Sequence, residues 1–231
     1  MVSSSYSASQ FLKHELGSCG NDGIVPGIPP RIHVIGSQGL CEELESCGFD
    51  ISGGPAPAAS SEMTREQLAD YNFPESPIDA LVVGHDTAMD FRKLTIADNL
   101  LLRNPDAMFV ATNRDNFDMV GADGRHIPGN GCTVVALEYS SRRVAQNVGK
   151  PSPILFELIR KDHPHAMSDP SRCLFVGDRL DTDIRFGNDN GMRSLLVMTG
   201  VTTADSMVRV GCGTEEEPLP DFIAPFVGVL V

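Results

Sequence analysis

The sequence predicts an α/β fold, in which strands of one or more parallel sheets alternate with helices. Two observations support this prediction. Short apolar runs alternate along the chain with stretches whose apolar residues recur at helical spacing, and several of the apolar runs end at a glycine. With 231 residues, the chain is long enough for one large domain or two modest ones.

Up to about residue 146 the elements follow one another in this alternating order. The predicted helices cover residues 5–16, 39–47, 91–103 and 131–145. The predicted strands cover residues 31–36, 78–84 and 107–111. Loops rich in glycine and proline are expected at 17–30 and 53–60.

A second unit is predicted to begin near residue 147. Its helices are expected at 153–161 and 182–190, and its strands at 172–176 and 194–198. A last apolar segment runs from 221 to 231. The domain boundary is therefore expected close to residue 146.

Composition excludes several classes of protein. The net charge of -13 repels phosphate backbones, so nucleic acid is not expected as a partner, and it does not favour anionic membranes either. No apolar run is long enough to cross a bilayer, and the N-terminus does not resemble a signal peptide. Six cysteines without a CxxC pair favour reduced thiols. These features predict a soluble, cytoplasmic protein.

The strongest chemical signal is the segment from Phe175 to Ile184, an apolar strand that runs into Gly-Asp and then Thr-Asp. Ligands of open α/β sheets bind at the carboxyl ends of strands, where Asp178 would lie. Its carboxylate suits Mg²⁺, a hard ion that takes oxygen ligands. Asp183 is expected as a supplementary ligand or as a residue that orients the ligands. The structural alternative is that Thr182 or Asp183 merely caps the following helix.

A second signal lies upstream, in Gly149-Lys150-Pro151. A glycine allows the backbone to approach a ligand, and a proline is well suited to open the next helix. A lysine held at this point supplies a compact positive charge for a phosphate group. Alone the tripeptide could equally be a surface linker, but the Gly-Asp segment that follows makes the pair of motifs specific.

Together these segments resemble the third and fourth motifs of the haloacid dehalogenase superfamily. Further stretches are similar to its nitrophenylphosphatase and phosphoglycolate phosphatase branch, which includes pyridoxal phosphate phosphatase and NagD-like proteins. These stretches are 82–86, 111–116, 129–132, 177–184 and 199–202.

The resemblance implies a Rossmann-like core, incomplete in these residues, with a large α/β cap. Residues 1–16 would form a hinge segment, 17–146 the cap and 147–231 the C-terminal part of the core. It further implies Mg²⁺ as cofactor and small phosphorylated metabolites as substrates, with a homodimer formed through the cap. Asn113, Arg114 and Asp115 would be cap residues that contact substrate, and Arg114 could meet a second anionic group. A solvated loop arginine is the alternative.

Family members attack phosphate with the first aspartate of an Asp-x-Asp-Gly motif, and a Thr/Ser-Asn motif holds the phosphoryl oxygens. Neither motif is found in its expected place, so we expect an N-terminally truncated chain without a nucleophile, inactive by itself. Asp181-Thr182-Asp183 is an Asp-x-Asp, but it belongs to the fourth motif. The alternative is a non-catalytic relative that serves as a binding or dimerising module. A nucleotide-binding Rossmann domain is disfavoured, because no Gly-x-Gly-x-x-Gly follows a strand.

Overall fold

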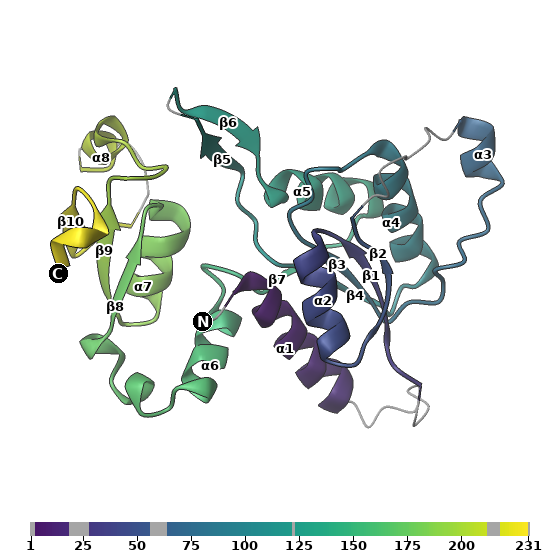
Figure 1. The fold of residues 1–231 in the computed structure, drawn as a ribbon, viewed down its shortest axis with the longest axis horizontal. Helices are drawn as coiled ribbons and strands as arrows, with labels where there is room; N and C mark the ends of the chain where they lie inside the picture. The colour runs from purple at the N-terminus through teal and green to yellow at the C-terminus, as the bar shows by residue number, and fades with distance from the viewer. Residues whose placement is uncertain (1–2, 19–27, 56–63, 122, 212–217, 231) are drawn as a thin grey trace. The chain divides into compact units, whose positions relative to one another are not determined.

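The protein is described by a computed structural model for residues 3–18, 28–55, 64–121, 123–211 and 218–230. The chain forms two compact units (Figure 1). The first comprises Met1–Phe117 with Pro128–Gly149, and the second comprises Asp118–Ile127 with Lys150–Val231. The predicted loops at 17–30 and 53–60 lie in large part outside the described residues.

The first unit is built on a parallel sheet of five strands in the order β2-β1-β3-β4-β7. These strands are β1 (Arg31–Ile35), β2 (Asp50–Gly53), β3 (Ala80–Val83), β4 (Met108–Ala111) and β7 (Gln146–Asn147). β3 is central, with Ile32 of β1 on one side of Ala80 and Met108 of β4 on the other. All four of its residues are buried, as a continuous apolar run in a parallel sheet predicts.

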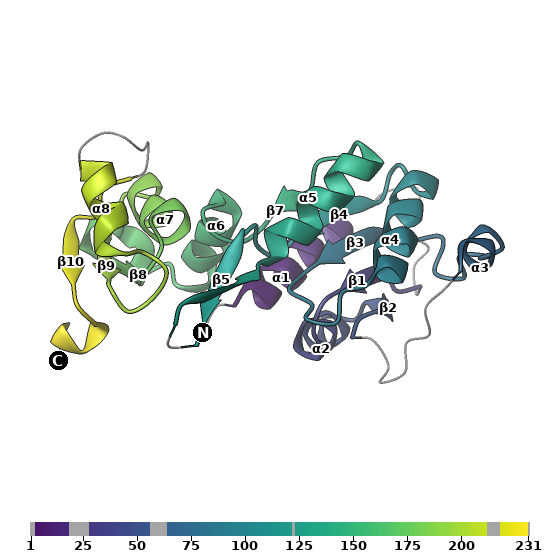
Figure 2. The same cartoon turned by 90° about the horizontal axis from the view of Figure 1, so that it is seen from above.

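Helices cover both faces of this sheet. They are α1 (Ser4–Ser18), α2 (Gln38–Ser46), α4 (Phe91–Arg103) and α5 (Asn130–Ser141), whereas the short α3 (Arg65–Ala69) buries none of its residues. Figure 2 shows α1 and α2 on one face and α4 and α5 on the other. A large apolar cluster lies beneath α4 and α5, where Leu81 and Val83 of β3 pack with Leu100 and Leu137.

The ends of α4 are fixed by polar side chains. Asp90 accepts a hydrogen bond from the Lys93 amide and so caps the N-terminus. At the other end, the Arg143 guanidinium donates to the carbonyls of Leu101 and Asn104 at 3.2 and 3.1 Å, and also to that of Ala107. The helix therefore has the bounds 91–103 that its sequence predicts.

The second unit contains a parallel sheet of three strands in the order β10-β9-β8. The strands are β8 (Leu174–Gly177), β9 (Arg193–Val197) and β10 (Phe222–Ala224). The helices are α6 (Pro153–Asp162), a π-helical turn (Leu180–Ile184), α7 (Arg185–Asp189) and α8 (Ala204–Gly211), with 3₁₀ turns at Ala166–Ser168, Pro170–Arg172 and Val227–Leu230. A two-stranded hairpin, β5 (Phe117–Val120) with β6 (Arg125–Pro128), completes the elements.

β8 is an edge strand, since it pairs only with β9 in the part of the chain that the structure describes. Phe175 packs on the buried Phe186 with ring centroids 4.9 Å apart, and this contact fixes β8 on α7.

The α/β prediction is confirmed, while several boundaries differ. The helix predicted over 131–145 ends at Ser141, because Arg142 adopts a left-handed conformation with φ 61°. The helix predicted from 182 begins at Leu180 as a π turn. The two units divide after Gly149, near the predicted boundary, and residues 118–127 group with the second unit. The assignment of hinge, cap and core to these parts stays a prediction.

Candidate functional site

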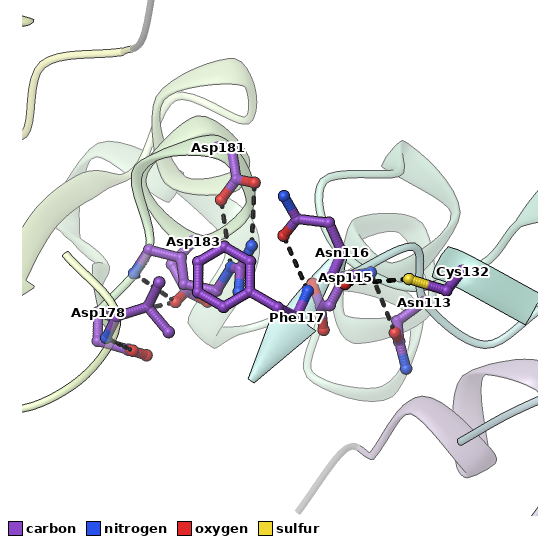
Figure 3. Close-up of polar contacts among 10 residues, drawn as sticks. Asn113, Asp115, Asn116, Phe117, Cys132, Asp178, Asp181 and Asp183 are labelled. Atoms are coloured by element: carbon purple, nitrogen blue, oxygen red, sulfur yellow. Dashed lines mark hydrogen bonds and ion pairs between the residues drawn. The ribbon is translucent and has the colours of Figure 1, made fainter. Parts of the chain in front are cut away.

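Asp178 lies directly after β8, at the carboxyl end of the sheet of the second unit. Figure 3 shows Asp178 beside Asp183 of the same unit. The loop after β9 holds Asp178 at two points. The Val201 amide donates to Oδ2 of Asp178 at 2.7 Å, and the Thr202 amide donates to its backbone carbonyl at 3.0 Å. The carboxylate is therefore fixed in direction where a ligand of such a sheet is expected.

Asp183 is buried in the π turn, and its side chain is only 4% exposed. Its Oδ2 accepts from the amides of Asp178 and Arg179 at 3.0 and 3.1 Å. Its Oδ1 pairs with Nζ of Lys150 at 2.5 Å. Three donors thus occupy both carboxylate oxygens, so the arrangement fits a residue that orients its neighbours better than a direct metal ligand.

Lys150 reaches Asp183 from the start of α6. Pro153 opens this helix and Ser152 caps it by accepting from the Ile154 amide at 3.3 Å. The lysine side chain stays 41% exposed although it is paired. The structure therefore brings together the lysine and both aspartates that the sequence singled out, with Asp183 as the link between Lys150 and Asp178.

Two glycines make this arrangement sterically possible. A Cβ atom at residue 177 would lie 2.2 Å from Cγ of Asp183, and one at residue 200 would lie 1.9 Å from Oδ2 of Asp178. Both distances are far below van der Waals contact. The carboxylates can take these positions only because Gly177 and Gly200 have no side chain.

The donor set suits a hard cation that keeps most of its water. In the described ranges, Oδ1 of Asp178 has no hydrogen bond, while Oδ2 is held by Val201. No group of three or more His, Cys, Asp or Glu residues is close enough there to enclose a metal. One free carboxylate oxygen fits Mg²⁺, which commonly binds through one or two carboxylates and several waters.

The residues predicted to contact substrate, Asn113 to Asp115, lie in the first unit after β4. Nδ2 of Asn130 donates to the Asn113 carbonyl at 2.8 Å, and the Gly131 amide donates to the Asp115 carbonyl at 2.8 Å. Oδ1 of Asn113 accepts from the Asp115 amide at 3.2 Å. The start of α5 thus holds this segment in one conformation, and its contact with substrate stays a prediction.

Arg114 has an ion-pair partner in the same unit. Its guanidinium bonds both carboxylate oxygens of Glu138 at 2.6 and 2.7 Å. This bidentate pair raises the pKa of Arg114 and lowers the pKa of Glu138. A second anionic group of a substrate would have to compete with Glu138 for the guanidinium.

Sequence reasoning missed several residues of these sites. Glu138 lies in no motif, and Asn130 was noted only as part of the stretch 129–132 that resembles the family. Arg179, buried beside Asp183, bonds the Asp181 carboxylate through Nε and a terminal nitrogen, each at 3.2 Å. The role of Val201 could have been suspected, because residues 199–202 belong to the stretches that carry the family resemblance.

None of the helices within the described ranges is long and apolar enough to cross a membrane. Fold and site together define an α/β protein whose charged residues gather at the carboxyl end of a parallel sheet.

Comparison with known proteins shows to which family this α/β protein belongs. A HAD-hydrolase-like family model matches residues 147–227. The chain is 36% identical over 227 residues to glycerol-3-phosphate phosphatase of Gallus gallus, covering 95% of this chain and 70% of the relative. It is 33% identical to phosphoglycolate phosphatase 2 of Arabidopsis thaliana, covering 100% of this chain and 70% of the relative.

Solved structures of phosphatases have the same fold as this chain. A 4-nitrophenylphosphatase from Thermotoga maritima superposes with a TM-score of 0.72 at 25% identity, covering 99% of this chain and 70% of that one. A glycerol phosphate phosphatase from Mycobacterium tuberculosis, in complex with magnesium, superposes with a TM-score of 0.67 at 28% identity, covering 96% and 55%. The chain therefore belongs to the haloacid dehalogenase phosphatase family, in its NagD-like branch of nitrophenyl- and phosphoglycolate phosphatases. It spans about two thirds of the length of the curated relatives, 70% in both cases given above.

Proposed function

We propose that this chain is part of a Mg²⁺-dependent phosphomonoester hydrolase acting on small phosphorylated metabolites, of the phosphoglycolate or nitrophenyl phosphate kind. The observation that carries the proposal is the linked arrangement of Lys150, Asp183 and Asp178 at the carboxyl end of β8. It lies within the segment that matches the family model. The named activities of the relatives support the reaction class, and the magnesium complex of one structural neighbour supports the metal.

Each residue would have a distinct task. Asp178 would hold Mg²⁺, which supplies positive charge beside the phosphoryl group. Lys150 would neutralise charge on the phosphate from a fixed position. Asp183 would fix the lysine and the loop after β8, because it binds both. The cytoplasmic location predicted from the sequence belongs to the same proposal.

We further infer that the 231-residue polypeptide is inactive by itself. Its Asp181-Thr182-Asp183 segment cannot supply the nucleophile as it stands. Both oxygens of Asp181 bind the Arg179 guanidinium, and those of Asp183 bind Lys150 and two backbone amides. A carboxylate engaged in this way is not free to attack phosphorus.

The test uses nitrophenyl phosphate and Mg²⁺. The purified polypeptide is expected to give no turnover above that of its Asp178→Ala variant. A polypeptide that also carries the family's Asp-x-Asp-Gly and Thr/Ser-Asn motifs should hydrolyse the substrate. In that protein Lys150→Ala should cost about 3 kcal/mol of barrier, roughly a hundredfold in rate. Turnover by the short chain that Asp178→Ala abolishes would contradict its inactivity. Near-parental rates in the Lys150→Ala protein would contradict the placement of the site.

A second candidate function is that of a dimerising module. The described part of the first unit exposes apolar side chains on and just after α5, among them Val135, Tyr139 and Val144 at 54, 81 and 84%. An exposed apolar strip of this kind favours a homodimer through the first unit, the part predicted to be the cap. Sedimentation should then show a dimer that Tyr139→Glu dissociates and Leu102→Glu, on α4, does not. A monomeric parent protein would exclude this function.

A further inference from the structure

The two oxygens of the Asp178 carboxylate have different surroundings. Oδ2 accepts the Val201 amide at 2.7 Å, whereas Oδ1 has no hydrogen bond within the described ranges. A cation that approached Oδ2 would have to share this oxygen with the amide hydrogen, which weakens the oxygen as a ligand. Oδ1, which accepts no hydrogen bond in the described ranges, is therefore the oxygen that favours a cation.

The loop after β9 holds this carboxylate in place without a side chain of its own. The Thr202 amide binds the Asp178 carbonyl at 3.0 Å, so the loop contacts main chain and side chain of the same residue. Gly200 faces the carboxylate so closely that a Cβ atom there would lie 1.9 Å from Oδ2 and 2.4 Å from Cγ. Since the carboxylate is the end of a movable side chain, a methyl group at residue 200 would turn it away and leave the strand in place.

We infer that Gly200 and the Val201 amide are positioning elements of the metal site, which restrict Asp178 to binding a cation through Oδ1 alone. The inference rests on the proposed function, because it takes Asp178 to be the ligand. It adds that the loop of residues 200–202, which supplies no metal ligand, determines the affinity of the site. Outer partners that orient a metal ligand typically change affinity about 10- to 100-fold when they are removed.

The experiment measures binding of Mn²⁺, a paramagnetic substitute for Mg²⁺ that also prefers oxygen ligands. The full 231-residue chain is titrated, and broadening of the Gly177 and Asp178 amide resonances gives the dissociation constant. Gly200→Ala is expected to weaken binding at least tenfold. The matched control is Gly39→Ala, because a Cβ at that position meets nothing within 4 Å. It should stay within about twofold of the parent, and Asp178→Ala should remove the selective broadening.

The outcomes separate the inference from the proposed function. If Gly200→Ala binds Mn²⁺ as tightly as the parent while Asp178→Ala does not bind it, the inference is wrong. The metal site itself is then still supported. Broadening that Asp178→Ala does not change would overturn the site itself, and with it the inference. A circular dichroism spectrum and β9 amide shifts like those of the parent show that Gly200→Ala has folded.

A measurement on the unaltered chain covers the case in which the variant does not fold. Occupation of Oδ1 by Mg²⁺ withdraws charge from Oδ2, which weakens it as an acceptor for the Val201 amide. The Val201 amide proton should therefore shift with Mg²⁺ and saturate at the concentration that saturates the shifts of Gly177. A Val201 amide that does not move while Gly177 and Asp178 respond would contradict the inference.

Discussion

His33 is a titratable residue in the interior of the first unit, on β1 and only 5% exposed. Its Nδ1 lies 3.0 Å from the Ser52 hydroxyl. Burial lowers the pKa of His33 from its ordinary value of 6.5 to about 4, and the nearby Glu75 offsets only part of this shift. The imidazole is therefore neutral in the folded protein at neutral pH.

This shift makes the first unit sensitive to acid. The unfolded chain takes up the proton near pH 6.5 and the folded chain only near pH 4. Stability therefore falls as pH drops through this interval, and the loss is complete below the folded pKa. At about 1.4 kcal/mol per pKa unit, His33 should account for roughly 3 kcal/mol.

Urea unfolding followed by circular dichroism across pH 4 to 6.5 measures this loss. His33→Asn cannot titrate in that range but can still bond Ser52, so its stability should depend less steeply on pH. A variant with the same pH slope as the parent would show that other groups cause the acid sensitivity.

At the scale of elements, the end of α4 depends on a side chain from beyond α5. Arg143 donates to three carbonyls at and after the last turn of α4, those of Leu101, Asn104 and Ala107. The last carbonyls of a helix have no partner within the helix, and a cation there is favoured by the helix dipole.

Arg143→Met keeps most of the apolar stem and removes all of these donors. The free energy of unfolding should fall by about 3 kcal/mol, as expected for several hydrogen bonds from a charged group to buried acceptors. The exposed neighbour Arg142 provides the control, since Arg142→Met loses only a ring contact at 6.0 Å from Tyr139. Urea titration compares the two variants, and equal losses would contradict the capping role of Arg143.

The elements also show what the sequence could predict. α4 appears at its predicted bounds because the Asp90 cap and the helical spacing act locally, although Arg143 from beyond α5 also binds carbonyls at its end. The short β7, the β5–β6 hairpin and α3 lack a long apolar period, so sequence patterns missed them. The π turn was missed for another reason. Its start depends on hydrogen bonds that Asp183 accepts from the loop after β8.

The candidate site was likewise predictable from the sequence only in part. Asp178 and Lys150 were predicted from the sequence because each lies in a short motif. Gly-Asp follows a strand, and Gly-Lys-Pro precedes a helix. The Val201 amide and the Glu138 carboxylate were not found as partners, because they join residues 23 and 24 positions apart in the chain. Such pairings depend on how the elements pack in the folded protein, and the spacing of apolar residues in the sequence carries no information about that packing.

At the scale of the whole molecule, the two sheets should differ in local stability. β3 is paired on both sides and its residues are fully buried. β8 is paired only with β9 in the described part of the chain, and Leu174 at its start is 41% exposed. Amides in edge strands open at lower free-energy cost than those in a buried centre.

Hydrogen exchange on the 231-residue chain tests this difference. Amides of Leu81 to Val83 should exchange slowest, and those of Leu174 to Val176 much faster. In a protein that includes the family's first two motifs, the later strand should become protected. Uniformly slow exchange in the short chain would contradict the prediction and favour the dimerising, non-catalytic reading.

Leu40 has a consequence for how this sheet can change in evolution. The strand order of the first unit is that of doubly wound sheets, whose ligands bind where β1 and β3 part. Here a methyl group of Leu40 fills that place, so close that a Cβ atom on Gly36 or on Gly84 would lie 2.7 Å from it. As long as residue 40 is leucine, alanine at either glycine destabilises the fold by a steric clash. As long as both glycines remain, a residue smaller than leucine at position 40 leaves a cavity. The three positions therefore constrain one another, and a variant able to bind a ligand here would have to exchange them together.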